Sequence, residues 1–152
     1  MISDMLKEES IQILDYINDW RDAIHISLRP LEKGGYVKAC YADEIIKNTE
    51  EIGPYYILTE DIALIHGRPE QGVIDKQIAV TLVRKPVWFS EDSFPVRVLI
   101  ALAATDSDSH MDVMKVLSSI FIDKEKIENM VNSKSEREIY GILLNEESER
   151  RK

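Results

Sequence analysis

One histidine of this chain stands where its side chain can do chemistry. His66 follows the apolar run Ile62–Ile65 and precedes Gly67, Arg68 and Pro69. Near neutral pH an imidazole is largely neutral and nucleophilic, and a phosphoryl group bound to it stays transferable. Gly67 leaves the ring uncovered and allows unusual backbone angles, Arg68 can neutralise phosphate oxygens, and Pro69 fixes the exit of the loop. We hypothesise that His66 carries a phosphoryl group. The alternative is that it only completes the hydrogen bonding at a strand end.

A second histidine, His110, closes the polar segment Asp106–His110. This segment follows an apolar run and precedes an amphipathic one, so His110 is expected just beyond a buried strand, at the start of a helix. α/β sheets bind ligands at that place. A helix N-terminus disfavours imidazolium and offers free N–H groups to an anion. We therefore expect His110 to donate a hydrogen bond to a phosphoryl group on His66, although a solvated loop histidine fits the spacing equally well.

Neither a metal site nor a nucleotide site is expected. His66, His110, Asp106 and Asp108 are scattered and lack a dense ligand signature, so they do not predict a metal centre. The sequence of residues 67–72, GRPEQG, is no dinucleotide fingerprint, and no Walker motif occurs. A nucleotide-using kinase is therefore not expected.

Four further polar residues are expected to have ordinary roles. His25 adjoins the apolar face of a predicted helix and is expected to be structural or exposed. Cys40 is expected to be a buried or half-buried thiol. Glu60 and Asp61 are expected to be solvated turn residues. If either carboxylate accepted a ring N–H of His66, it would instead orient the imidazole.

Periodicity along the chain predicts the elements that position these residues. Short β-rich or continuously apolar runs predict strands at residues 10–16, 55–59, 62–65, 78–83, 87–89 and 96–105. Apolar residues at three- and four-residue spacing predict helices. The first helix is expected to begin after Asn18 or Asp19, to be kinked or ended by Pro30, and to be closed by Gly34-Gly35. Further helices are expected over Lys38–Ile52, Val113–Phe121, Asp123–Met130 and Ser135–Leu144. Helices flanking a central mixed sheet give an α/β sandwich of one domain.

Composition and charge exclude several function classes. The formal net charge is −9, which argues against binding to nucleic acid or to an anionic membrane surface. The longest apolar run, residues 98–104, is too short to span a bilayer, and the charged N-terminus lacks a signal-peptide core. The single cysteine excludes an intrachain disulfide. A cytoplasmic protein is the default expectation.

Two blocks of the chain resemble the enzyme IIA domains of the phosphotransferase system (PTS), mannitol/fructose superfamily. The segment Ala63–Val73 follows the usual form A-[LM]-P-H-[AG]-R-P-E-x-G-V, except that Ile65 stands in place of proline. The segment Pro95–Ala104, followed by Asp106–His110, is also similar. Together the two blocks resemble the L-ascorbate branch most closely, and the resemblance covers nearly the whole chain.

The resemblance implies a carrier with protein partners. It implies a mannitol/fructose-type EIIA fold over residues 1–147, followed by a charged tail at residues 148–152. Such a domain accepts a phosphoryl group from the phosphocarrier protein HPr and passes it to a cysteine of a cognate EIIB. EIIB then phosphorylates the sugar that enters through EIIC in the membrane. The resemblance implies no metal and no cofactor beyond the transient phosphoryl group. It is compatible with a homodimer.

The same resemblance implies roles for particular residues. His66 would be the phosphohistidine, and His110 would stabilise the transferring group. Arg68, Gly67 and Ser109 would bind it. Two other functions compete with transport: a regulatory phosphoprotein, read by a transcription factor or transporter, and a binding module with a vestigial site. The intact residues around His66 argue against the vestigial module.

Overall fold

Five strands form one mixed sheet at the centre of the computed structural model, which describes residues 1–106 and 111–150. The spatial order is β1-β4-β5-β3-β2. The strands are β1 (Ile11–Leu14), β2 (Ile57–Thr59), β3 (Asp61–Ile65), β4 (Gln77–Val87) and β5 (Val96–Ala103). Two neighbouring pairs are parallel, β1 with β4 and β3 with β5, and the others are antiparallel. The predicted α/β class with a mixed sheet is confirmed.

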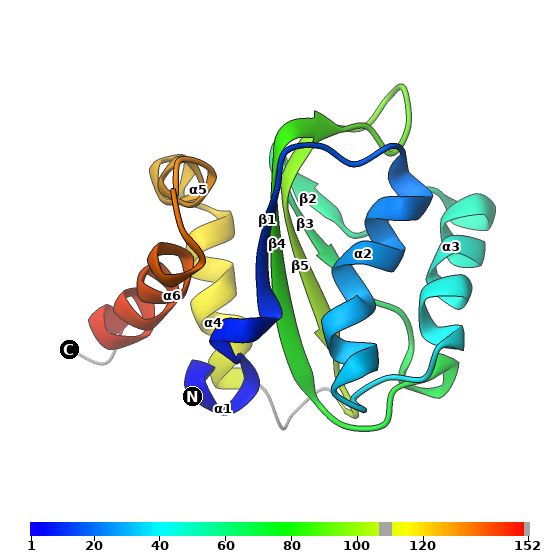
Figure 1. Cartoon of the computed structure of the whole chain (residues 1–152), viewed down its shortest axis with the longest axis horizontal. Coiled ribbons are helices and arrows are strands. Elements are labelled where there is room, and N and C mark those ends of the chain that lie inside the picture. The colour runs from blue at the N-terminus through cyan, green and yellow to red at the C-terminus, as the bar shows by residue number, and fades with distance from the viewer. Residues whose placement is uncertain (107–110, 151–152) are drawn as a thin grey trace.

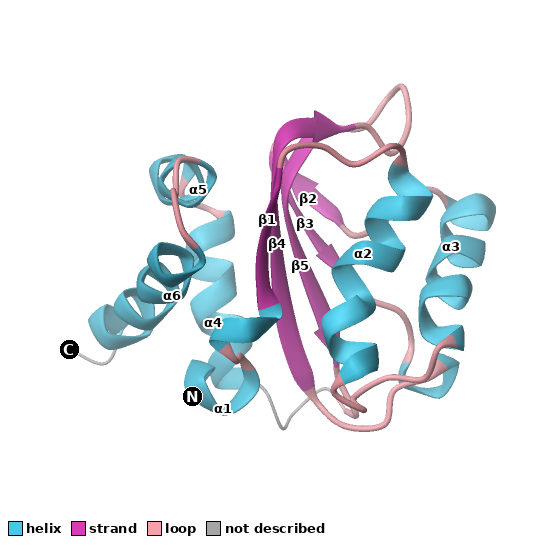
Figure 2. Ribbon diagram, viewed as in Figure 1, coloured by secondary structure: helices cyan, strands magenta, loops and turns pink. Residues whose placement is uncertain are grey.

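Helices cover both faces of this sheet (Figures 1 and 2). On one face lie α2 (Trp20–Lys33) and α3 (Cys40–Ile52). On the other face lie α1 (Ile2–Met5), α4 (Met111–Phe121), α5 (Lys124–Val131) and α6 (Glu136–Arg150). Among the described helices, none is both long and apolar enough to cross a membrane.

The sandwich explains why the central strands read as unbroken apolar runs. Along β5, Val98, Ile100 and Leu102 pack into the core on the α4–α6 side, while Leu99 and Ala101 pack into the core on the α2–α3 side. Successive side chains of a strand point to opposite faces, so a strand covered on both faces needs apolar residues at every position.

Most predicted elements form with small shifts in their ends. Asp19 caps α2 as expected, because its carboxylate accepts a hydrogen bond from the N–H of Asp22 at 2.9 Å. Pro30 does not end that helix, which continues to Lys33. The strand predicted at residues 87–89 does not exist separately. Instead, β4 continues through Pro86 to Val87, which lies opposite Val96 of β5.

Two burial predictions and one helix end were wrong. Cys40, the first residue of α3, is exposed, and its Sγ lies 3.7 Å from the Gln71 carbonyl oxygen. Asp61 is buried rather than solvated. The helix predicted to end at Leu144 continues as α6 to Arg150, and its Glu146 and Glu147 are both buried. The division into residues 1–147 and a tail at 148–152 stays a prediction.

The candidate site lies where the carboxyl ends of two neighbouring strands meet. β3 and β5 are parallel neighbours with Ile65 opposite Ala101, so their carboxyl ends share an edge. His66 leaves β3 at this edge, and Ala104 leaves β5 beside it. Ile65 is fully buried and continues β3 up to His66. The carboxyl ends of β3 and β5 therefore lie side by side at the candidate site.

Candidate functional site

Backbone geometry holds the His66 ring at the end of β3. The side chain is half-buried, and its Nδ1 lies 2.6 Å from the carbonyl oxygen of Leu64. A carbonyl can only accept, so Nδ1 carries the proton and donates it. In the neutral ring, Nε2 therefore keeps its lone pair. The edge of the Tyr55 ring packs against the imidazole at a centroid distance of 5.5 Å. The arrangement leaves Nε2 as the nucleophilic atom.

Gly67 is fixed by the buried Tyr41 of α3. The N–H of Gly67 donates to the Tyr41 hydroxyl at 2.9 Å, and this hydroxyl donates to the Leu102 carbonyl of β5 at 3.0 Å. Burial raises the pKa of Tyr41 to about 12, so the hydroxyl keeps the proton that it donates. Tyr41 thus ties the loop after β3 to the end of β5.

Glycine is required at position 67 for a different reason from the predicted one. Gly67 is not among the residues with positive φ. Its role is close approach, because an added Cβ would lie 2.9 Å from Gln71 Oε1 and 3.1 Å from Ile45 Cγ1. The loop therefore packs directly onto α3, with no space for a side chain between them.

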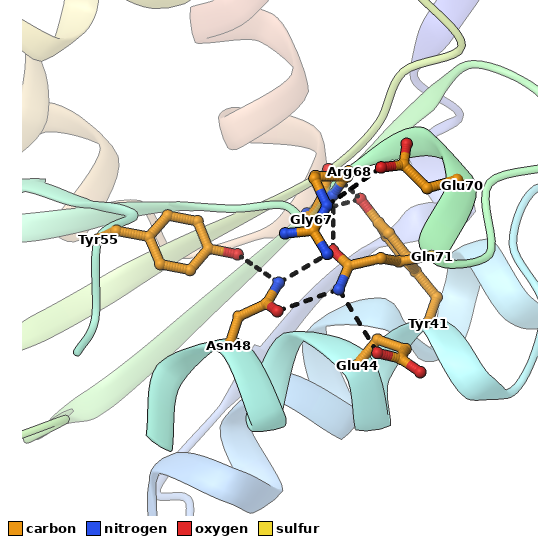
Figure 3. A network of polar contacts seen from close by, with 8 residues as sticks. All are labelled: Tyr41, Glu44, Asn48, Tyr55, Gly67, Arg68, Glu70 and Gln71. Carbon is orange, nitrogen blue, oxygen red and sulfur yellow. Dashed lines mark hydrogen bonds and ion pairs between the residues drawn. The ribbon is translucent and has the colours of Figure 1, made fainter. Parts of the chain in front are cut away.

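Arg68 is held through its backbone and not through its side chain. Its N–H donates to Gln71 Oε1 at 2.8 Å. Gln71 and Asn48 of α3 form a reciprocal amide pair, with distances of 2.9 and 3.0 Å (Figure 3). The exposed Arg68 guanidinium lies 3.1 Å from a carboxylate oxygen of Glu70. It stands on the surface, where an incoming anion can compete for it.

The tyrosine before β2 completes this network. The Tyr55 hydroxyl donates to the His66 carbonyl, and Asn48 Nδ2 lies 3.4 Å from the same hydroxyl. Burial raises the pKa of Tyr55, although the Asn48 contact acts in the opposite direction. Tyr55 is half-buried, whereas its neighbour Tyr56 is fully buried.

Sequence reasoning missed Tyr41, Asn48 and Gln71 as site residues. Both polar side chains are buried: Asn48 is 9% exposed and Gln71 is 7% exposed. The available signal was spacing, because Tyr41, Ile45 and Asn48 lie on one face of α3 at steps of four and three. A polar residue on such a face needs a buried partner.

The acidic pair Glu60-Asp61 does not orient His66. Asp61 begins β3 at the opposite end of the strand and accepts two hydrogen bonds from Arg97, at 2.8 and 2.9 Å. This contact raises the pKa of Arg97. Asp61 also adopts a positive φ of 73°. Its role is structural.

Three of the remaining predicted residues, Asp108, Ser109 and His110, lie outside the described residues. Within residues 1–106 and 111–150, no cluster of three His, Cys, Asp or Glu side chains is arranged to hold a metal ion. His25 lies on α2, partly exposed, with Nε2 3.5 Å from a carboxylate oxygen of Asp43. Its predicted structural or exposed role is confirmed.

Comparison with known proteins gives relatives that include a mannitol-specific and an ascorbate-specific component of the phosphotransferase system. The chain is 33% identical over 142 residues to the mannitol-specific cryptic phosphotransferase enzyme IIA component of Escherichia coli (strain K12), across 93% of this chain and 97% of that protein. It is 32% identical over 141 residues to the ascorbate-specific PTS system EIIA component of Shigella boydii (serotype 4, strain Sb227), across 91% of this chain and 92% of that protein.

Solved structures agree with this. The solution structure of the E. coli mannitol-specific cryptic enzyme IIA matches with a TM-score of 0.87 at 33% identity, over 95% of this chain and 98% of that one. The complex of enzyme IIAMTL and phosphorylated enzyme IIBMTL from E. coli matches with a TM-score of 0.77 at 25% identity, over 93% and 99%. The family model for the phosphoenolpyruvate-dependent sugar phosphotransferase system, EIIA 2, matches residues 4–146. The chain therefore belongs to the EIIA 2 family of the sugar phosphotransferase system.

Proposed function

We propose that this chain is a phosphocarrier that accepts a phosphoryl group on Nε2 of His66 and passes it to a partner protein. The observation that carries the proposal is the 2.6 Å contact between His66 Nδ1 and the Leu64 carbonyl, which commits Nδ1 to the backbone and leaves Nε2 to react. The position fits, because a half-buried ring at a strand end can be reached by a residue of another protein.

The transfer needs no change in the ring proton. In the first step, the Nε2 lone pair attacks the phosphorus of the donor phosphohistidine. The N–P bond of the donor breaks, and its electron pair returns to the donor nitrogen. In the second step, an acceptor thiolate attacks the same phosphorus, and the pair of the Nε2–P bond returns to Nε2. While the group is bound, the ring carries positive charge, and the Nδ1–H bond to Leu64 becomes charge-assisted.

Side chains, and not the adjacent backbone, would neutralise the phosphoryl oxygens. The N–H groups of Gly67 and Arg68 already donate to Tyr41 and Gln71. The Arg68 guanidinium is exposed and can exchange Glu70 for the phosphoryl group. We propose His110 and Ser109 as further stabilising groups on the basis of the sequence pattern. Phosphoryl transfer depends on such positioning and charge stabilisation and on little else.

HPr is the proposed donor, and a cysteine of EIIB the proposed acceptor. The similarity to the enzyme IIAMTL that forms a complex with phosphorylated enzyme IIBMTL supports EIIB. EIIC would then receive the sugar in the membrane, while this chain works in the cytoplasm. The sugar is proposed to be L-ascorbate from the two sequence blocks, although a mannitol-specific and an ascorbate-specific relative have nearly equal identity.

Reconstituted labelling tests the proposal. Radiolabelled phosphoenolpyruvate, enzyme I and HPr should label the chain on an acid-labile, base-stable site, and His66→Ala should abolish the label. His25→Ala, which removes a partly exposed histidine from α2, is the matched control and should retain it. Phosphorus NMR of the product should give the shift of an Nε2-phosphohistidine. If the His66→Ala variant still takes up label, His66 is not the phosphorylated residue.

Transfer to several acceptor proteins identifies the partner that receives the phosphoryl group. The labelled chain is mixed with EIIB proteins of the ascorbate and mannitol types, and loss of label to each is followed in time. Faster transfer to the ascorbate-type EIIB is expected. Transfer to neither acceptor would remove EIIB from the proposal and leave a regulatory role as the alternative.

A further inference from the structure

We propose that Asn48, Tyr55 and Gln71 are positioning residues, which hold the backbone of residues 66–68 so that Nε2 of His66 stays aimed at the partner. The inference rests on the proposed function, since it assigns these residues to the phosphoryl transfer at His66. None of the three needs to touch the phosphoryl group. They act through the His66 carbonyl and the Arg68 N–H.

Backbone groups of three consecutive residues beyond β3 bond to side chains. The His66 carbonyl accepts from Tyr55, the Gly67 N–H donates to Tyr41, and the Arg68 N–H donates to Gln71. β3 itself ends at Ile65. The direction in which the chain leaves the sheet is therefore set by side-chain partners at each of these groups.

The amide pair joins two of these supports into one unit. Arg68 N–H is a donor, so the Gln71 atom that faces it must be Oε1. Gln71 Nε2 must then donate to Asn48 Oδ1, and Asn48 Nδ2 is left to donate to Gln71 Oε1. Asn48 Nδ2 also faces the Tyr55 hydroxyl, whose own proton goes to the His66 carbonyl. One chain of contacts therefore runs from the Arg68 N–H to the His66 carbonyl. Figure 3 shows its part from Arg68 through Gln71 and Asn48 to Tyr55.

Burial makes this unit rigid. Asn48 and Gln71 are nine-tenths or more buried, and a buried polar network with satisfied partners admits one arrangement. An in-line transfer is sensitive to misplacement of its nucleophile, and a shift of about 1 Å can cost roughly a hundredfold in rate. Losing one support should therefore slow transfer, while the docking surface of the carrier stays intact.

The test compares Gln71→Met and Tyr55→Phe with Tyr56→Phe. Tyr56 is the neighbouring buried tyrosine, and its hydroxyl contacts Thr49 Oγ1 at 2.8 Å. Phosphoryl transfer from phosphorylated HPr is measured for each folded variant. We expect kcat to fall roughly ten- to a hundredfold in Gln71→Met and Tyr55→Phe. For Gln71→Met the KM for phosphorylated HPr should stay within about twofold, since Gln71 is buried. Tyr56→Phe should match the wild-type protein.

A spectroscopic measurement reads the positioning without any transfer. Nitrogen NMR of the unphosphorylated protein reports which ring nitrogen of His66 carries the proton. The Nδ1–H form should dominate in the wild-type protein and in Tyr56→Phe, and the other tautomer should gain population in Gln71→Met. Equal tautomer populations and equal kcat in Gln71→Met and the wild-type protein would overturn the proposal.

A double variant separates positioning from stability. Asn48→Leu combined with Gln71→Met replaces both amides by apolar groups, which restores stability relative to the single variants. The Arg68 N–H still lacks its acceptor, so kcat should stay low. Recovery of wild-type kcat together with stability would refute positioning. A wild-type chain that takes no label would instead refute the proposed function, and the tautomer measurement would still decide the positioning.

Discussion

A backbone carbonyl two residues earlier in the chain selects the ring nitrogen of His66 that we propose to react. Many functional histidines are oriented by a carboxylate, and the acidic pair that precedes His66 in the sequence is Glu60-Asp61. Asp61 instead lies at the far end of β3, bonded to Arg97. Because the Leu64 carbonyl belongs to the strand, the tautomer of His66 depends on how the chain bends after Ile65. The residues that control this bend therefore matter for reactivity.

Gly67→Ala should destabilise the chain and slow transfer. The added methyl group would lie 2.9 Å from Gln71 Oε1 and 3.1 Å from Ile45 Cγ1, so the loop must move away from α3. We expect a loss of about 1–3 kcal/mol in the free energy of unfolding, measured by urea denaturation. Gly141→Ala is the control, because a Cβ there would meet no atom of the described chain within 4 Å. In the helix α6 it should stabilise by about 0.5–1 kcal/mol. Equal stability of Gly67→Ala and the wild-type protein would contradict the close packing.

Asp61→Asn should test the buried pair at the other end of β3. Asparagine tolerates positive φ as aspartate does, so the backbone at 73° is preserved while the charge is removed. Arg97 then loses its charged partner, and we expect a loss of about 1.5–3 kcal/mol in the free energy of unfolding. Phosphoryl acceptance at His66 should not change. If Asp61→Asn slowed transfer at full stability, Asp61 would belong to the site after all.

At the level of elements, the sequence predicted the strands and helices better than their surroundings. The apolar runs before His66 and at residues 98–104 indicated buried strands, and both lie in the sheet. Asp19 indicated the start of α2. These predictions succeed because periodicity and capping are local properties of the chain.

Two buried polar residues that sequence reasoning missed, Asn48 and Glu146, have environments supplied by distant parts of the chain. Asn48 is buried because Gln71, 23 residues later, supplies its partner. Glu146 is buried because Lys126 and Ser119 approach it from α5 and α4, at 2.7 Å each. The spacing of Asn48 from Tyr41 and Ile45 indicates the face of α3 on which it lies, but no local pattern identifies the distant partner of either polar residue. The site was therefore predictable at His66, whose motif is contiguous, and not at its supports on α3.

The end of α6 should make stability depend on pH. Burial acts to raise the pKa of Glu146, but its bonds from Lys126 and Ser119 outweigh burial, and the pKa lies below its usual value of 4.5. A carboxylate with a lowered pKa in the folded state contributes stability that is present above pH 4.5 and is lost as the pH falls through the folded value. The free energy of unfolding should therefore fall more steeply below about pH 5 in the wild-type protein than in Glu146→Gln.

Urea denaturation at a series of pH values measures this difference. Glu149→Gln removes an exposed carboxylate from the same helix and controls for the change in net charge. Identical pH profiles for the wild-type protein and Glu146→Gln would show that the contact with Lys126 contributes nothing to stability.

At the scale of the whole molecule, the proposed reacting residue and the most deeply buried strands lie in different parts of one sheet. Helices bury both faces of β4 and β5, while β2 pairs only with β3 and does so irregularly. His66 follows β3, which lies between the buried centre and this edge. The proposed nucleophile, His66, is thus attached to a rigid strand on one side. On the other side it adjoins a loop that depends on side-chain contacts.

Hydrogen exchange should show that local stability is highest in β5 and lowest among the strands in β2. Amides of β5 should exchange most slowly, because its residues lie between β3 and β4 under helices on both faces, and local opening there requires global unfolding. Amides of β2 should exchange fastest among the strands, because this three-residue strand is only half-buried. In Gln71→Met, the Gly67 and Arg68 amides should lose protection while β5 keeps its own, because those two amides bond to side chains and β5 bonds to strands. If protection fell in β5 to the same extent, the loop and the sheet would open as one unit, and Gln71 would act on global stability instead of on the position of His66.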